Sequence, residues 1–202
     1  MKLILIRHGE TEWNKQRRIQ GCRSDTRLSQ KGLEEADRLA AALRNERVDA
    51  IYSSPLKRAA ETAQIISDAC KVKVQLVNEL REIDAGALDG LFETELTGTY
   101  ETAWRELGSG DASISLPGGE SLLDVAKRTS WAIDRLLERH ADGTVLVVAH
   151  LLVNLVMVCQ LLGTDLSRVS HLRLAPASIT ILELTTQGNS LLLLNDTCHL
   201  QH

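Results

Sequence analysis

The first nine residues constrain this chain most, because the apolar run 3–6 is followed at once by Arg7, His8 and Gly9. A short run of apolar, partly β-branched residues predicts a buried strand. Ligands bind at the carboxyl ends of strands in open α/β sheets, so charge, imidazole and flexible glycine at this point indicate a site. Arg7 offers donors that suit phosphate oxygens, and His8 is a candidate base, metal ligand or nucleophile. Taken alone, the three residues fit a structural histidine equally well.

Length and composition narrow the classes of protein to consider. A chain of 202 residues suits a single domain, residues 1–202, with a sizeable core, and its 44% hydrophobic content is ordinary for a soluble globular protein. The formal charge of −4 gives no general attraction to nucleic acid, and 3% aromatic residues are too few for a base-stacking surface. Any anionic ligand must therefore be held by a local cluster of Arg and His side chains.

Strand-like and helix-like patterns alternate along the chain, which predicts an α/β fold. We expect three layers, a mainly parallel sheet with helices on both faces, and an antiparallel C-terminal hairpin at one edge. Predicted strands cover residues 3–6, 48–53, 72–77, 144–149, 178–184 and 191–195, and predicted helices begin near residues 29, 55, 93, 121 and 151.

Residues 91–119 look inserted between the third strand and the helix that begins near Ser121. We expect a helix over 93–107, followed by glycine-containing stretches at 108–111 and 116–119. An irregular excursion near strand ends usually carries a lid or specificity elements, and we expect that role here.

One apolar segment, 145–162, has about the minimum length of a membrane span. His150, Asn154 and Gln160 interrupt it, so a buried strand followed by a buried helix is the better interpretation, and we expect no membrane partner. The apolar run at the N-terminus stops too soon for a signal peptide, and the four cysteines form no C-x-x-C pair. These features favour a cytoplasmic protein.

Polar groups follow three further predicted strands. Arg58 lies in the first turn of the helix that Pro55 opens, where exposed N–H groups assist anion binding, although an arginine there is more often a surface residue. Glu82 follows the third strand and is either a general acid or part of a solvent-facing turn with Asp84. His150 follows the fourth strand, in the same placement as His8.

The carboxyl ends of parallel strands lie on one edge of a sheet, so these groups are expected to converge there. Two arginines, two histidines and one carboxylate suit the transfer of a phosphoryl group. That reaction needs charge stabilisation on the equatorial oxygens, an in-line nucleophile and a proton for the leaving oxygen. The arginines of the polar loop 15–27 either form the rim of such a pocket or face solvent; they are Arg17, Arg18, Arg23 and Arg27.

Several motifs in chain order resemble the histidine phosphatase superfamily, also called the phosphoglycerate mutase-like family. The similarity runs through essentially the whole chain. It is carried by Arg7-His8-Gly9-Glu10-Thr11 with Asn14, by Ser53-Ser54-Pro55-Leu56-x-Arg58-Ala59-x-x-Thr62-Ala63, by Leu80-x-Glu82-Ile83 and by the strand-borne His150.

This resemblance implies a role for each residue of the cluster. It makes His8 the nucleophile that becomes phosphorylated and Glu82 the proton donor, while Arg7, Arg58 and His150 bind the phosphoryl group. It further implies substrate contacts from Asn14, Gln20, Gly21 and Leu151. No metal or other cofactor is then expected, since cationic side chains neutralise the charge. The expected partner is a small phosphorylated substrate, and a homodimer is expected.

The sequence departs from the family pattern at two places. Leu151-Leu152 follows His150 where the family commonly has glycine, and Gly86-Ala87-Leu88-Asp89-Gly90 replaces Gly-x-Trp-Glu-Gly. The first change narrows the expected phosphate pocket, and the second alters packing near Glu82. Neither removes a group that performs chemistry.

The end of the chain resembles one subgroup of the family. Residues 194–200, with Gly118-Gly119-Glu120-Ser121-Leu122, are similar to the metal-independent phosphoserine phosphatases, and ribazole phosphatases and broad-specificity phosphatases share parts of the pattern. Phosphoserine is therefore the leading candidate for the substrate. Residues 195–202 are expected either to fray or to fold back towards the pocket mouth.

Other functions remain open from the sequence. A phosphoglycerate mutase uses the same groups, but the resembling mutases are usually longer. A metallohydrolase could use His8, His150, Glu82 and Asp84, but the chain has no spaced pair such as H-x-x-x-H to support it. A non-catalytic phospholigand-binding protein would not need the nucleophile and the acid.

Overall fold

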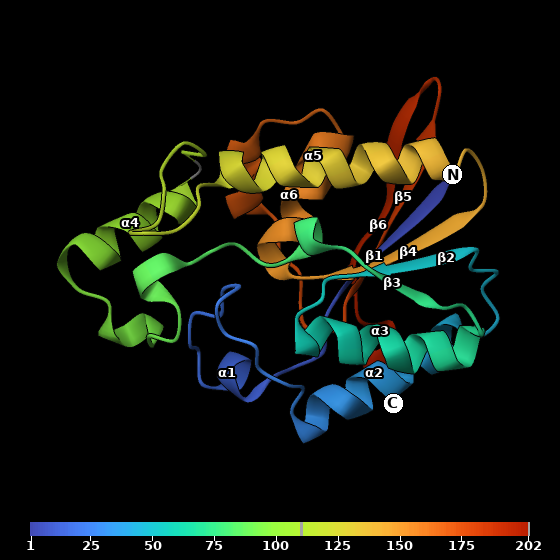
Figure 1. Cartoon of the computed structure of the whole chain (residues 1–202), viewed down its shortest axis with the longest axis horizontal. Helices are drawn as coiled ribbons and strands as arrows, with labels where there is room; N and C mark the ends of the chain where they lie inside the picture. Colours follow the sequence, from blue (N-terminus) through green and yellow to red (C-terminus); the bar gives the residue numbers. More distant parts are fainter. Residues whose placement is uncertain (110, 202) are drawn as a thin grey trace.

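The computed structural model describes residues 1–109 and 111–201, which fold around a six-stranded sheet (Figure 1). The strand order is β3-β2-β4-β1-β5-β6, and the first four of these strands are parallel to one another. Strand β5 pairs antiparallel with β1 and also antiparallel with β6. The strands are β1 (Lys2–Arg7), β2 (Ala50–Ser53), β3 (Val74–Leu76), β4 (Thr144–Ala149), β5 (Ile179–Thr185) and β6 (Gly188–Asp196). The expected α/β fold with its C-terminal edge hairpin is confirmed.

Helices cover both faces of this sheet, so the domain has three layers (Figure 1). On one face lie α2 (Gln30–Leu43) and α3 (Lys57–Cys70), which pack on Ile4 and Ile6 of β1. On the other lie α5 (Leu122–Arg139) and α6 (Leu151–Leu161), which share a cluster with Leu3 and Leu5. The apolar run 3–6 is therefore continuous because β1 is buried on both faces.

Shorter elements fill the connections. They are α1 (Glu12–Lys15), η1 (Asn78–Leu80), η2 (Gly86–Leu88), η3 (Glu93–Glu95), α4 (Gly98–Ser109), η4 (Leu166–His171) and η5 (Cys198–Leu200). None of the helices among the described residues is both long and apolar enough to cross a bilayer.

The helix after β2 begins two residues later than the sequence predicts. Pro55 lies before the helix, and α3 starts at Lys57, whose backbone N–H donates to Asp25 Oδ1 at 2.7 Å. Because the acceptor of this capping bond belongs to a distant loop, the sequence around residue 57 does not predict where the helix begins. As a result Arg58 is the second helical residue and is fully buried, which excludes its interpretation as a surface arginine.

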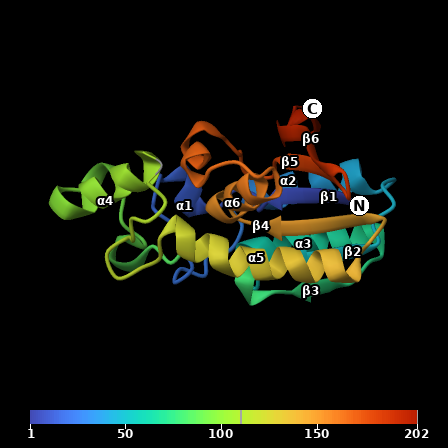
Figure 2. The same cartoon turned by 90° about the horizontal axis from the view of Figure 1, so that it is seen from above.

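The segment 91–119 leaves the body of the domain at the end where the parallel strands finish. Its helix, expected over 93–107, is divided into η3 and the later α4, which extends beyond the sheet (Figure 2). Gly98 has a positive φ of 59° at the start of α4, a conformation that glycine adopts readily. Gly110, within the predicted glycine-containing stretch, lies outside the described residues.

The C-terminal residues neither fray nor reach the pocket mouth, so both expectations for this tail are wrong over its described part. After β6 the chain turns into η5, which packs against α2, and Arg38 Nη1 donates to the Leu200 carbonyl at 2.8 Å. His202 lies outside the described residues.

Candidate active site

The structure brings the predicted groups together at the carboxyl edge of the parallel strands. Arg7 ends β1 and His8 follows it, while Arg58 comes from the helix after β2. Glu82 lies beyond β3 and η1, and His150 directly follows β4. The rings of His8 and His150 are 5.2 Å apart between centroids. Four of these five side chains are buried, and the fifth, that of Arg7, is half-buried.

The imidazole of His8 is held in one orientation. Its Nδ1 donates to the carbonyl of Gly9 at 2.7 Å, which leaves the lone pair on Nε2. Burial, followed by the positive charges of Arg58 and Arg7, lowers the pKa of His8 well below its usual value. His8 is therefore neutral near pH 7, which is the state that a nucleophile requires.

The two arginines are held by backbone carbonyls. Arg58 donates to the carbonyls of Ser24 at 2.9 Å and Gly21 at 3.1 Å, and Arg7 Nη1 donates to Leu174 at 2.6 Å. The Nε atoms of both arginines are buried and have no partner among the described residues.

Both guanidinium groups are cationic near neutral pH. Burial lowers the pKa of Arg58 to about 10, and it lowers the pKa of Arg7, although Glu82 partly opposes both shifts. Two cations with unused donors, Arg58 fully buried and Arg7 partly buried, suit a doubly charged phosphoryl group.

Glu82 lies at the N-terminus of α6. Its Oε1 accepts from the backbone N–H of Ile83 at 2.9 Å, and its Oε2 accepts from the N–H of Leu152 at 3.3 Å. Burial raises the pKa of Glu82 above its usual value, and these backbone donors and Arg58 oppose the shift. A carboxyl with a raised pKa in a cationic site can give up and recover a proton, as a general acid must. Its neighbour Asp84 instead forms an ion pair with Arg23, 2.7 Å from Arg23 Nε.

His150 caps α6 and contacts the turn between β2 and α3. Its Nε2 lies 2.8 Å from Ser54 Oγ, which also accepts the Leu56 N–H at 3.3 Å. When the Ser54 hydroxyl donates its proton to Nε2, the neutral His150 ring carries its own proton on Nδ1. The Nδ1 atom is buried and has no partner among the described residues. Burial and then Arg58 lower the pKa of His150 well below its usual value. His150 thus offers a neutral N–H donor for a phosphoryl oxygen.

The four predicted substrate contacts all line the same cavity, but most of their polar atoms have other partners. The side-chain Oδ1 of Asn14 accepts from the Thr11 N–H at 3.1 Å in the cap of α1. Gln20 Nε2 donates to Thr11 Oγ1 at 3.1 Å, and the Gly21 carbonyl accepts from Arg58. Leu151 lines the cavity with its side chain. Asn14, Gln20 and Gly21 therefore shape the site as well as lining it.

The cavity above His8 has a volume of about 650 Å³ and two kinds of wall. One wall is polar and includes the charged side chains of Arg18, Glu93 and Arg173. The guanidinium of Arg18 packs against the ring of Phe92, 4.0 Å from the ring centroid. The other wall is apolar and consists of residues from α4, α6 and the η4 region, namely Trp104, Leu107, Leu151, Leu152, Leu155, Val169, Leu172 and Leu174.

Sequence patterns identified only part of this lining. Of the four loop arginines, Arg18 lines the cavity and the other three do not. Trp104 lies in the segment 91–119, for which the sequence predicts a lid or specificity role. The direction in which its side chain points depends on how α4 packs. Arg173 and the apolar residues around it belong to a connection without any motif, so no sequence signal identifies them.

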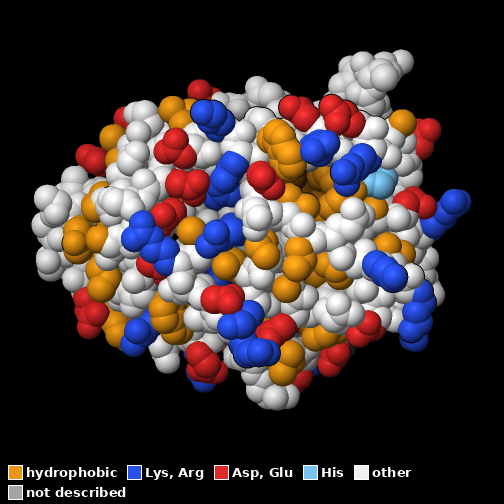
Figure 3. All heavy atoms as spheres, in the orientation of Figure 1, with side chains coloured by type: hydrophobic (Ala, Val, Ile, Leu, Met, Phe, Trp, Pro, Cys, Tyr) orange, Lys and Arg blue, Asp and Glu red, His pale blue; other side chains and the backbone are white. Residues whose placement is uncertain are grey.

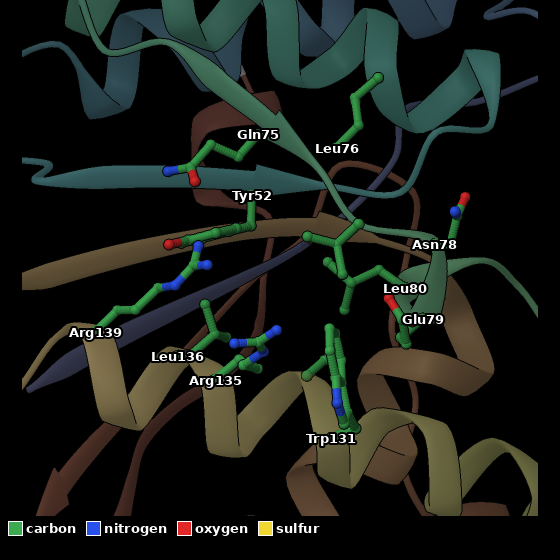
Figure 4. Close-up of a pocket in the computed structure, with 12 residues that line it drawn as sticks. Tyr52, Gln75, Leu76, Asn78, Glu79, Leu80, Trp131, Arg135, Leu136 and Arg139 are labelled. Atoms are coloured by element: carbon green, nitrogen blue, oxygen red, sulfur yellow. The ribbon is translucent and has the colours of Figure 1, made fainter.

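A second, smaller cavity of about 280 Å³ lies between β3 and α5 (Figure 4). Trp131, Arg135 and Arg139 reach into it from α5, and Tyr52 and Leu76 come from the strands (Figure 4). None of the predicted site residues lines it. Over the face seen in Figure 3, basic and acidic side chains are intermixed, in keeping with the small net charge. No three His, Cys, Asp or Glu side chains in the described part of the chain are grouped to hold a metal ion.

Comparisons with known proteins agree with this geometry. The family model described as histidine phosphatase superfamily (branch 1) matches residues 3–197. Phosphoserine phosphatase 1 of Hydrogenobacter thermophilus is 38% identical over 200 residues, 99% of this chain and 94% of the relative. A probable phosphoglycerate mutase of Yersinia pestis is 34% identical over 180 residues, 89% of this chain and 83% of the relative. A mutant phosphoserine phosphatase of Entamoeba histolytica, solved in complex with phosphoserine, has a TM-score of 0.88 at 32% identity and 98% coverage of both chains.

Proposed function

Because this chain belongs to branch 1 of the histidine phosphatase superfamily and is therefore a phosphatase, we propose that it hydrolyses phosphomonoesters through a phosphohistidine at His8. The observation that carries this proposal is the His8 imidazole, whose Nε2 lone pair is free because Nδ1 donates to Gly9. A neutral imidazole near two cationic arginines is suited to attack a phosphorus atom.

In the first step His8 Nε2 forms a bond to phosphorus while the bond from phosphorus to the ester oxygen breaks. The Glu82 carboxyl gives its proton to the departing oxygen, so an alcohol leaves and Glu82 becomes a carboxylate. Arg7, Arg58 and the His150 Nδ1 proton neutralise charge on the equatorial oxygens.

In the second step water replaces the alcohol. The Glu82 carboxylate takes one proton from water as its oxygen bonds to phosphorus and the phosphorus–nitrogen bond breaks. Inorganic phosphate is released, and both His8 and Glu82 return to their starting states.

Rapid quenching tests this mechanism. Enzyme mixed briefly with labelled substrate should carry an acid-labile, base-stable phosphate on His8, and turnover should survive EDTA. Label on a serine or aspartate, or activity that requires added zinc or magnesium, would overturn the proposal. Stoichiometric binding without any turnover would favour a phospholigand-binding protein.

Phosphoserine is the leading candidate for the substrate. It carries a carboxylate and an ammonium group beyond the phosphate, and the cavity supplies Arg18 and Arg173 for the first and Glu93 for the second. Phosphoserine phosphatase 1 of Hydrogenobacter thermophilus is similar over nearly the whole chain. Release of phosphate from phosphoserine with a higher kcat/KM than from 3-phosphoglycerate would support this substrate.

The apolar wall around Trp104 and Leu155 favours a second candidate, the phosphate ester of a bulkier, partly apolar alcohol such as ribazole. Burial of apolar surface would raise the affinity for such an ester, and a cavity of about 650 Å³ leaves room for it. Comparing kcat/KM for phosphoserine, α-ribazole 5′-phosphate and p-nitrophenyl phosphate separates the two candidates.

A mutase activity is the remaining alternative, supported by the probable phosphoglycerate mutase of Yersinia pestis. A mutase must exclude water while the phosphohistidine persists. Conversion of 3-phosphoglycerate into 2-phosphoglycerate faster than release of phosphate would establish it, and the reverse ratio would leave the phosphatase.

Three further properties belong to the proposal. Segment 91–119 acts as the specificity element, which is supported by Trp104 and Leu107 in the cavity lining.

A homodimer is expected, and sedimentation measures it. A cytoplasmic location is supported by all four cysteines being free.

A further inference from the structure

The loop between η4 and β5, residues 172–178, holds the proposed phosphate-binding residues in place. The carbonyl of Leu174 accepts from Arg7 Nη1 at 2.6 Å, and that of Ser178 accepts from the Arg7 backbone N–H at 3.3 Å. The Ala177 N–H donates to the His8 carbonyl at 3.1 Å. The position of the Arg7 guanidinium therefore depends on where this loop lies.

The loop itself is irregular. Ala177 has a φ of +55° in the turn that Ser178 closes on Ala175, with the Ser178 N–H 3.2 Å from the Ala175 carbonyl. The left-handed region disfavours a residue with a Cβ atom, so such a turn persists only where neighbouring structure supports it.

Part of that support comes from Asn195 at the end of β6. Its Oδ1 accepts from the Ala175 N–H at 2.7 Å, and this N–H belongs to the same peptide as the Leu174 carbonyl that holds Arg7. The Asn195 N–H in turn donates to Thr180 Oγ1 at 3.2 Å on β5. These bonds connect the edge strand with the loop.

A break in strand pairing places the Asn195 side chain there. Ile179 pairs with Asp196 and Ile181 pairs with Leu193, so β6 uses one residue more than β5 over this stretch. Asn195 has a φ of +56°, a conformation that asparagine tolerates better than most residues. β-Bulges often redirect a side chain beside a site.

We propose that Asn195 is a positioning residue for Arg7, acting through the Leu174–Ala175 peptide. This inference rests on the proposed function, in which Arg7 binds the phosphoryl group. Without the Asn195 acceptor, the Ala175 N–H loses its partner and the peptide is free to rotate. The Leu174 carbonyl then no longer fixes the guanidinium for an incoming phosphate.

Two substitutions at this position separate the side-chain bond from the backbone conformation. Asn195→Gly removes the acceptor while glycine adopts a φ of +56° at little cost, and Asn195→Asp keeps an acceptor oxygen and tolerates the same φ. The readouts are the inhibition constant of orthovanadate, a phosphate mimic, and kcat and KM for p-nitrophenyl phosphate. We expect Asn195→Gly to weaken vanadate binding and raise KM about three- to tenfold, with a smaller change in kcat, and Asn195→Asp to recover most of the loss.

Asn189→Gly is the matched control, since Asn189 lies on the same strand and its Nδ2 donates to the Leu161 carbonyl at 2.7 Å, away from the loop. This variant should change thermal stability without changing the vanadate constant. If Asn195→Gly fails to fold, Thr180→Val removes the acceptor of the Asn195 N–H and should weaken vanadate binding in the same direction.

An Arg7→Ala background decides whether Asn195 acts through Arg7. In that background Asn195→Gly should cause no further loss of vanadate affinity, and a full additive loss would overturn the inference. Unchanged affinity in Asn195→Gly, when Arg7→Ala alone weakens binding, would overturn only the role of Asn195. Unchanged affinity in Arg7→Ala itself would overturn the proposed phosphate site and the inference with it.

Discussion

The backbone N–H of Leu152 donates to Glu82 Oε2 at 3.3 Å, which places the proposed proton donor against the first turn of α6. The same helix is capped by His150, so one helix N-terminus positions both the proposed acid and the imidazole that is proposed to bind the phosphoryl group. Leucine follows the histidine where the family commonly has glycine, and the structure shows that this residue pair lines the cavity while its backbone holds Glu82.

Glu82→Gln should reduce turnover in a way that depends on the leaving group. A general acid contributes about 10²–10⁴-fold when the leaving oxygen needs a proton. We expect a loss of about that size for phosphoserine and a much smaller one for p-nitrophenyl phosphate, whose phenolate leaves unprotonated. Steady-state kinetics on both substrates measures the difference, and equal losses would indicate a structural role for Glu82.

The same substitution should change how stability depends on pH. The pKa of Glu82 is raised in the folded protein, so the folded state binds this proton more tightly than the unfolded state does. The stabilisation is complete below the unfolded pKa and is lost as pH rises through the folded value. Relative to Glu82→Gln, the wild-type protein should therefore lose stability from about pH 4 upwards.

Thermal unfolding of the two proteins across pH 4–8 checks this expectation. Glu61→Gln serves as a control, because Glu61 pairs with Arg27 outside the cavity. A stability difference between wild type and Glu82→Gln that grows in favour of the wild type as pH rises would contradict the raised pKa.

Removing the hydroxyl of Ser54 should weaken phosphate binding. Ser54→Ala leaves His150 Nε2 without its partner, so the neutral ring is no longer restricted to the tautomer with a proton on Nδ1. Leaving one buried polar atom unpaired costs about 1–3 kcal/mol, and a loss of this size in vanadate affinity or stability is expected. Ser53→Ala is the neighbouring control, since the Ser53 hydroxyl donates to the Ser54 carbonyl and not to His150.

Trp104→Ala should distinguish the two substrate candidates. The ring belongs to the apolar wall, so its removal should lower kcat/KM for α-ribazole 5′-phosphate more than for phosphoserine. Trp131→Ala, in the cavity between β3 and α5, should leave both values unchanged. Equal effects of Trp104→Ala on both substrates would remove the argument for a bulky alcohol.

Most of the proposed reactive groups could be predicted because they follow a buried strand or lie in the first turn of a helix; Glu82 is the exception, since it follows the largely exposed β3 and η1. His150 comes directly after a continuous apolar run and His8 follows another by one residue, and parallel strands bring such ends to one edge. The start of α5 is also determined locally, because Ser121 and Asp124 form a capping box whose two reciprocal bonds lie within four residues.

What could not be predicted depends on contacts between distant segments. The start of α3 is fixed by Asp25, and the orientation of Arg7 by a carbonyl near residue 174. The C-terminal tail packs on α2 through the Leu200 carbonyl, which no side-chain pattern reveals. Local periodicity carries no information about such bonds, because each joins residues more than thirty positions apart.

The environment of Arg58 has a consequence for engineering this protein. Its guanidinium is fully buried against the carbonyls of Ser24 and Gly21, and among the described residues it has no carboxylate within ion-pair distance. An empty site therefore keeps an unneutralised charge in the interior, at a cost in folding free energy that a bound anion would offset. An apolar replacement at this position would remove that charge together with the proposed phosphate-binding guanidinium, and it would leave the Ser24 and Gly21 carbonyls without these donors, so a gain in stability here would come at the expense of activity.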